Sequence, residues 1–152
     1  MKKRFLSVLV MLALIITTIY IYETASNTTF NKIILDQVNV DEITSIESIK
    51  PSDDKNVNEE VITVEGSEEI KKILDYFSNI ELKDISSVPN NYTESYQIIL
   101  RTKEGRRFGI ELYDENYLSI YDYKATAKGN SLFKITNHID PGSIQKLLES
   151  KS

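Results

Sequence analysis

The segment at positions 96–122, YQIILRTKEGRRFGIELYDENYLSIYD, constrains the fold most strongly. Apolar and polar residues alternate along it, and residues typical of turns interrupt the alternation twice. Alternation with a period of two is typical of strands that bury one face. We therefore predict three consecutive antiparallel strands, joined by three-residue loops at positions 103–105 and 114–116, with Gly105 in a left-handed conformation.

These two loops fix a register in which apolar side chains stand opposite apolar side chains. A shift of one residue would move every apolar side chain to the opposite face of the sheet, so the register is strongly specified. The segment therefore predicts one continuous apolar core face. The predicted pairs on this face are Leu100 with Phe108, Ile98 with Ile110, Tyr96 with Leu112, Leu112 with Leu118, and Ile110 with Ile120.

The other face of the same three strands carries the candidate binding residues. The register places Tyr121 opposite Gly109, where the tyrosine ring would cover the glycine. Exposed tyrosines and arginines are enriched at protein interfaces, so we interpret this face as a binding surface. The alternative is a solvated sheet face with half-buried tyrosines. The candidate residues are Tyr113, Tyr117, Tyr121, Arg101 and Arg107.

The N-terminal part of the sequence has the pattern of a membrane-targeting segment. Three basic residues at positions 2–4 precede an apolar run, Phe5–Ile21, which as a helix would span about 26 Å. A bilayer core is about 30 Å thick, and basic residues favour the cytoplasmic side. We predict an uncleaved transmembrane anchor with its N-terminus in the cytoplasm. The alternative is a signal peptide cleaved within positions 23–26.

The predicted domain organisation follows from that segment. Positions 1–22 form the signal-anchor or transmembrane segment, and positions 23–29 form a polar linker. Positions 30–150 form an extracytoplasmic domain. Short runs in that domain predict further strands at positions 32–38, 43–49, 61–65 and 132–137.

Two helices are predicted to accompany the strands. Apolar residues recur at helical spacing over positions 68–79, and Ser67 is a favourable N-cap for that helix. Asp140 and Pro141 are typical of the start of a short C-terminal helix, in which Ile139 would contact Ile144. The predicted fold class is α+β, with an antiparallel sheet of about five to seven strands, one main helix on one face and a short C-terminal helix.

Several kinds of chemistry are absent from the sequence. The chain has no cysteine, which excludes disulfides and zinc–thiolate sites. Its net charge of −5 becomes −8 without the three N-terminal basic residues, which argues against a nucleic-acid partner. The acidic loop 50–60 lacks the order of a calcium-binding loop, and the single histidine, His138, has no catalytic motif around it. We expect no cofactor, no metal and no enzymatic activity.

The leader MKKR…ITTIY, the absence of cysteine, and the strand pattern followed by ITNHIDPGSIQKLLE together carry a whole-chain resemblance. The chain resembles small uncharacterised exported or single-anchor membrane proteins of Gram-positive bacteria. The sequence thus predicts a membrane-anchored, non-enzymatic binding or accessory module with a protein or envelope component as its partner. One alternative is an immunity-type or regulatory partner of an integral membrane protein. Another is a small envelope hydrolase.

Overall fold

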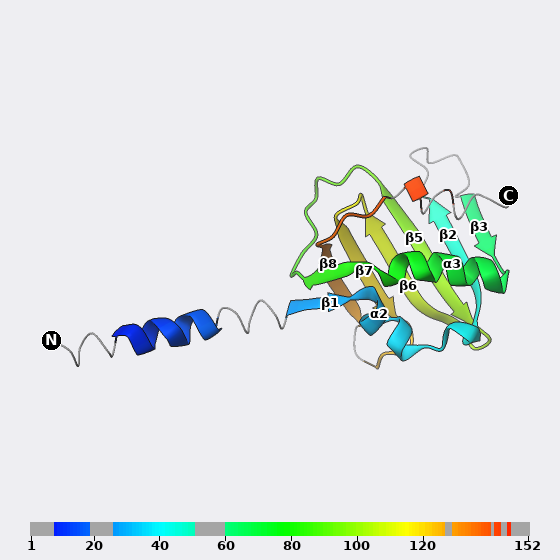
Figure 1. Ribbon diagram of the computed structural model, residues 1–152. Coiled ribbons are helices and arrows are strands. Elements are labelled where there is room, and N and C mark those ends of the chain that lie inside the picture. Colours follow the sequence, from blue (N-terminus) through cyan, green and yellow to red (C-terminus); the bar gives the residue numbers. More distant parts are fainter. Residues whose placement is uncertain are drawn as a thin grey trace.

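Eight antiparallel strands form one sheet, and helices α2 (Phe30–Ile33) and α3 (Ser67–Ser78) lie across one of its faces (Figure 1). The computed structural model describes residues 8–18, 26–50, 60–126, 129–140, 142–143 and 146. The predicted α+β class with an antiparallel sheet is confirmed. The predicted strand number is too low, because the sheet has eight strands rather than five to seven.

The strands follow the order β1-β4-β8-β7-β6-β5-β2-β3 across the sheet. Each strand pairs antiparallel with its neighbours, so β1 and β3 form the two edges. The strands are β1 (Asn27–Thr29), β2 (Ile43–Lys50), β3 (Glu60–Val64), β4 (Glu81–Asp84), β5 (Ser95–Thr102), β6 (Gly105–Tyr113), β7 (Tyr117–Asp122) and β8 (Asn130–Ile135).

The predicted register of β5, β6 and β7 is confirmed in all five of its apolar pairs. The first loop is one residue shorter than predicted, because Thr102 already pairs with Gly105. The register then shifts between Arg101 and Leu100, so that the pairing with Phe108 is restored by a β-bulge. Gly105 has a φ of 112°, a conformation that glycine adopts without steric cost.

The segment predicted as a strand over positions 32–38 is helical instead. It forms α2 and the 3-10 turn η1 (Leu35–Gln37), and a second 3-10 turn, η2 (Val40–Glu42), leads into β2. Thr29 caps α2, since its Oγ1 accepts a hydrogen bond from the Lys32 amide at 3.3 Å. Phe30 and Ile34 are four residues apart and both fully buried. The helical turn places both side chains on one side and into the core.

Strands β1 and β4 were not predicted from the sequence. Residues 27–29 were expected in the linker, yet they pair with residues 81–83 of β4. On its other side β4 pairs with β8. Both strands are short, and partners distant in the sequence stabilise them.

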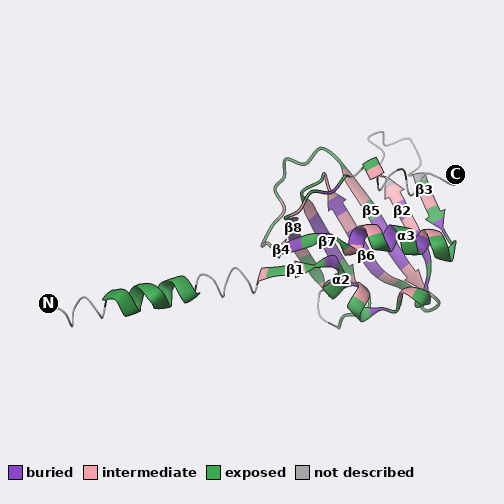
Figure 2. Cartoon of the chain, viewed as in Figure 1, coloured by how far each residue is buried: buried purple, intermediate pink, exposed green. Residues whose placement is uncertain are grey.

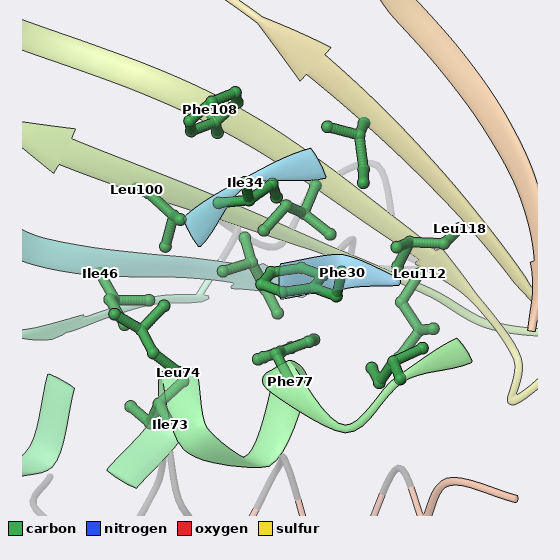
Figure 3. Close-up of a cluster of buried hydrophobic side chains, with 14 of the residues drawn as sticks. Phe30, Ile34, Ile46, Ile73, Leu74, Phe77, Leu100, Phe108, Leu112 and Leu118 are labelled. Atoms are coloured by element: carbon green, nitrogen blue, oxygen red, sulfur yellow. The ribbon is translucent and has the colours of Figure 1, made fainter. Parts of the chain in front are cut away.

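Helix α3 supplies the centre of the core. Its buried residues Ile70, Ile73, Leu74 and Phe77 form the predicted apolar stripe. The Phe77 ring stacks on the Phe30 ring, with centroids 5.1 Å apart, beside Leu100, Phe108 and Leu112 of the strands (Figure 3). The N-cap of α3 is Gly66 rather than Ser67, which is the first helical residue.

Hydrogen bonds attach the chain after β8 to α3. The Tyr76 hydroxyl donates to the Asp140 carbonyl and accepts from the Asp140 amide, both at 2.8 Å. The Asp140 carboxylate accepts from the Gly142 amide and the Ser143 hydroxyl, as expected of a helix cap. Residues 142, 143 and 146 are helical, whereas Pro141 and Ile144 of the predicted helix lie outside the described residues.

Residues 8–18 form a helix separate from the sheet, and all of its residues are exposed (Figure 2). The two ends of the predicted anchor, at positions 5–7 and 19–21, lie outside the described residues, as does most of the acidic loop 50–60. Among the residues that are described, no helix has both the length and the apolar character needed to cross a membrane.

Candidate binding face

The face of the sheet opposite α2 and α3 is called here the open face. Its side chains alternate along the strands with those of the core, so the register assigns them directly. Ile99 of β5, Gly109 of β6 and Tyr121 of β7 stand in one cross-strand row. The neighbouring row contains Gln97, Glu111 and Ser119. The open face is therefore polar and aromatic where the covered face is apolar.

Two tyrosines and an arginine gather at one end of the open face, and we call them the Tyr121–Tyr123 cluster. The rings of Tyr121 and Tyr123 pack edge to face with centroids 4.8 Å apart. The Arg106 guanidinium lies 6.0 Å from the Tyr123 ring centroid, within reach of a cation–π interaction. Tyr121 is 43% exposed and Tyr123 is 38% exposed. The cluster thus offers preformed aromatic surface beside a cation.

The ring that lies over Gly109 belongs to Tyr123, not to Tyr121 as predicted. A Cβ atom at Gly109 would stand 3.3 Å from Tyr123 Cε2 and 3.4 Å from its hydroxyl oxygen. The Tyr123 amide also donates to the Arg107 carbonyl at 3.1 Å, which holds this residue beside β6. The absence of a side chain at Gly109 therefore lets the Tyr123 ring lie close against the strand.

A second aromatic group lies at the other end of these strands. Tyr113 stands opposite Tyr117, as predicted, and its ring lies 4.8 Å from that of Tyr92. The Tyr113 hydroxyl donates to Glu111 Oε2 at 2.8 Å. Burial raises the pKa of the Tyr113 phenol above its ordinary value, and the hydrogen bond and the charge of Glu111 raise it further. Tyr113 is therefore a neutral hydrogen-bond donor.

The two predicted arginines are separated in the structure. Arg101 stays on the open face, where its Nε lies 2.5 Å from Glu47 Oε1 of the neighbouring strand β2. Arg107 forms an ion pair with Asp122, and its guanidinium lies 4.1 Å from the Phe108 ring centroid. Because Asp122 stands opposite Phe108, this ion pair belongs to the covered side of the sheet. Arg107 is therefore no part of the open face.

Four of the five predicted residues lie on the open face, together with residues that were not predicted. The four are Tyr113, Tyr117, Tyr121 and Arg101. Tyr113 and Tyr117 are neighbours, while Tyr121 is four residues further along β7, about 13 Å away. Tyr123, Arg106 and Tyr92 were missed. Arg106 was missed because the bulge was not predicted. Tyr123 lies in a turn and Tyr92 in a loop, and outside strands alternation does not predict which face a side chain occupies.

Among the residues that the structure describes, no group of three or more histidine, cysteine, aspartate or glutamate side chains could hold a metal ion. A polar hollow near the β5–β6 hairpin contains the ion pair between Lys124 and Glu104. Its lining residues are Asp41, Glu42, Thr102, Lys103, Glu104 and Lys124.

No protein-family model, no curated protein sequence and no solved structure matches this chain.

Proposed function

We propose that the protein is a non-enzymatic binding module, held at the outer face of the cell membrane by Phe5–Ile21. Its open face would bind a protein partner through the Tyr121–Tyr123 cluster. The observation that carries this proposal is the exposure of two mutually packed tyrosines beside Arg106.

The geometry of the cluster favours a binding role. Tyrosine presents a large contact area while losing little conformational entropy on binding. The edge-to-face contact between Tyr121 and Tyr123 restricts both rings before any partner arrives, which lowers that loss further. Tyrosine and arginine are also among the residues most enriched at binding hot spots. Neither ring belongs to the hydrophobic core.

The helix of residues 8–18 supports the proposed anchor. Large apolar side chains project from it with exposures between 50% and 67%. Its two threonines are satisfied internally, because the Thr17 hydroxyl donates to the Ala13 carbonyl and the Thr18 hydroxyl to the Leu14 carbonyl, each at 2.8 Å. A hydroxyl bonded within its own helix reduces the free-energy cost of leaving water. The basic residues at positions 2–4 favour a cytoplasmic N-terminus.

The binding proposal is tested by photo-crosslinking from intact membranes. A photoreactive amino acid replaces Asn130, which is exposed on β8 directly opposite Tyr121, and the full chain is expressed as wild type and as Tyr121→Ala/Tyr123→Ala. A specific adduct with the wild type that is lost in the double variant supports the proposal. Tyr92→Ala is the matched control, because Tyr92 is also 43% exposed but lies with Tyr113. Equal adduct yield from all three proteins contradicts it.

The anchor is tested separately. We expect the full chain to stay with membranes after extraction at alkaline pH, and external protease to remove the domain from protoplasts. Release of soluble protein with a new N-terminus near Asn27 would instead establish the cleaved signal peptide.

A further inference from the structure

A cross-strand row on the open face joins the start of the domain to the tyrosines. Asn27 of β1 pairs with Lys83 of β4, which pairs with Lys134 of β8. Lys134 in turn pairs with Tyr117 of β7, which stands opposite Tyr113. Lys83 follows the fully buried Leu82 on its strand, and Lys134 lies between the buried Phe133 and Ile135. Both lysines therefore project from the open face.

The two lysines form an unfavourable pair within the protein. Like charges directly opposite one another on antiparallel strands repel and destabilise the pairing. Within the described ranges neither lysine makes an ion pair, since the salt bridges there join other residues. Acidic residues also share this face: Glu81 lies two residues from Lys83 on β4 without an ion pair in the described ranges, and Glu111 lies two strands from Lys134 and accepts the Tyr113 hydroxyl. An external anion would relieve the repulsion.

The row also contains the residue at which the chain enters the sheet after the proposed anchor. From Ile21 to Asn27 the chain can extend at most about 20 Å. Strands lie about 4.8 Å apart, so Lys83 and Lys134 lie within about 10 Å of Asn27 across the sheet. The anchor proposed above would thus keep lipid headgroups within reach of both lysines. Tyr117, the next residue of the row, is of the type enriched at membrane–water interfaces.

We propose that Lys83, Lys134 and Tyr117 dock the domain on the surface of a bilayer that contains anionic lipids. The proposal rests on the anchor part of the proposed function and leaves the Tyr121–Tyr123 cluster free for a partner. Charge complementarity supplies the attraction, and the short connection to Asn27 favours the lipid surface over a soluble anion, because it keeps that surface within reach of both lysines. Each lysine near such a surface contributes enough to change the docked fraction several-fold.

The test uses a tryptophan reporter. The sequence contains no tryptophan, so Tyr117→Trp in the full chain introduces a single one. The protein is reconstituted in vesicles of brominated phosphatidylcholine, with or without phosphatidylglycerol. We expect bromine to quench the fluorescence of the introduced tryptophan only in the anionic vesicles. We also expect 0.5 M NaCl to remove the quenching, because salt at that concentration screens the attraction.

The lysines are tested by charge removal in the same protein. Lys83→Gln/Lys134→Gln should lower the ratio of docked to undocked protein by about 25-fold, at about fivefold per lysine. The matched control, Lys72→Gln/Lys103→Gln, removes the same charge from other surfaces and should leave the quenching unchanged. Lys83→Arg/Lys134→Arg keeps both positive charges and should show the same quenching as the protein with both lysines.

Two further outcomes separate this proposal from the anchor. Vesicle flotation reports the anchor alone, and failure to float with pure phosphatidylcholine would contradict the anchor. Flotation of all variants together with quenching that survives in Lys83→Gln/Lys134→Gln would overturn the docking proposal. Removal of the quenching by inorganic phosphate at constant ionic strength would also overturn it, because that result indicates a site for the free anion.

Discussion

The two faces of the sheet are built from the same strands but differ in the interactions that their side chains make. On the covered face, apolar side chains of β5, β6 and β7 pair with one another and pack under Phe30 and Phe77. On the open face, polar and charged side chains interact in pairs, as Arg101 does with Glu47. Ile99 is 1% exposed although no helix of the described residues covers it. The contrast indicates that the covered face supplies most of the stability, whereas the open face is available for recognition.

The largest effect should come from the centre of the covered face. We expect Phe30→Ala to lower the free energy of unfolding by about 3–5 kcal/mol, because a fully buried ring stacked on Phe77 would be lost. A domain of this size has about 5–15 kcal/mol of stability in total. Urea unfolding followed by circular dichroism measures the change. Val61→Ala on β3, where Val61 is 53% exposed, is the control and should change little.

An unchanged urea midpoint for Phe30→Ala would contradict the packing of α2 into the core. In that case the comparison between the faces would fail, because the buried residues would contribute no more than the exposed ones.

A smaller effect is expected at the edge of the covered face. Tyr76→Phe keeps the ring that packs edge to face on Phe77, with centroids 6.2 Å apart, but removes both hydrogen bonds to Asp140. We expect a loss of about 1–3 kcal/mol, because each of the two bonds contributes about 0.5–1.5 kcal/mol net. Thermal unfolding measures it, with Tyr117→Phe on the open face as the matched control. Equal melting temperatures would show that the hydrogen bonds of Tyr76 add no stability.

Much of the sheet was predictable because local signals agreed with one another. Two turns and two runs of alternation fixed the register of β5, β6 and β7. Where stability comes from distant partners, the sequence carried less information. The run IIL at positions 33–35 suits a strand, yet the burial of Phe30 and Ile34 favours a helical turn. Strand β4 is only four residues long and forms between β1 and β8.

The sequence predicted which tyrosines lie on the candidate binding face, but not the contacts that they make there. Tyr113, Tyr117 and Tyr121 follow from alternation, which extends along a strand. The position of Tyr123 depends on a turn after β7 and on the space above Gly109, and neither is a local property of the sequence. Because of the β-bulge, Arg107 forms an ion pair with Asp122, whereas Arg106 lies beside the Tyr123 ring.

A pH-dependent contribution is expected where the loop before β5 meets the β6–β7 turn. Asp114 has a φ of 48°, and its carboxylate accepts hydrogen bonds from the Thr93 and Glu94 amides. Burial raises the pKa of Asp114, but these bonds and that of the Thr93 hydroxyl outweigh it, so the net pKa is lowered. The contribution to stability is therefore present above the unfolded-state pKa of about 3.8 and is lost as pH falls through the folded-state value.

The measurement is the free energy of unfolding from pH 2 to pH 7. Asp114→Asn should flatten the acid limb of that curve while leaving the backbone in place, because asparagine also tolerates a left-handed conformation. The effect should be smaller than that of Tyr76→Phe, since solvent competes for this carboxylate. An acid limb identical to that of the wild type would contradict the role given to Asp114.

The smallest effects are expected on the open face. Tyr117→Ala and Tyr121→Ala should each change the free energy of unfolding by less than about 1 kcal/mol, as surface substitutions usually do. Tyr123→Ala should cost more than Tyr121→Ala, because the Tyr123 ring covers Gly109 whereas Tyr121 only contacts that ring. Thermal unfolding of the three single variants measures the order. A larger loss of stability for Tyr121→Ala than for Tyr123→Ala would indicate that the Tyr121 ring, not the Tyr123 ring, covers Gly109. If all three losses are small while the double variant Tyr121→Ala/Tyr123→Ala loses its crosslinked partner, then stability and recognition reside on opposite faces of one sheet.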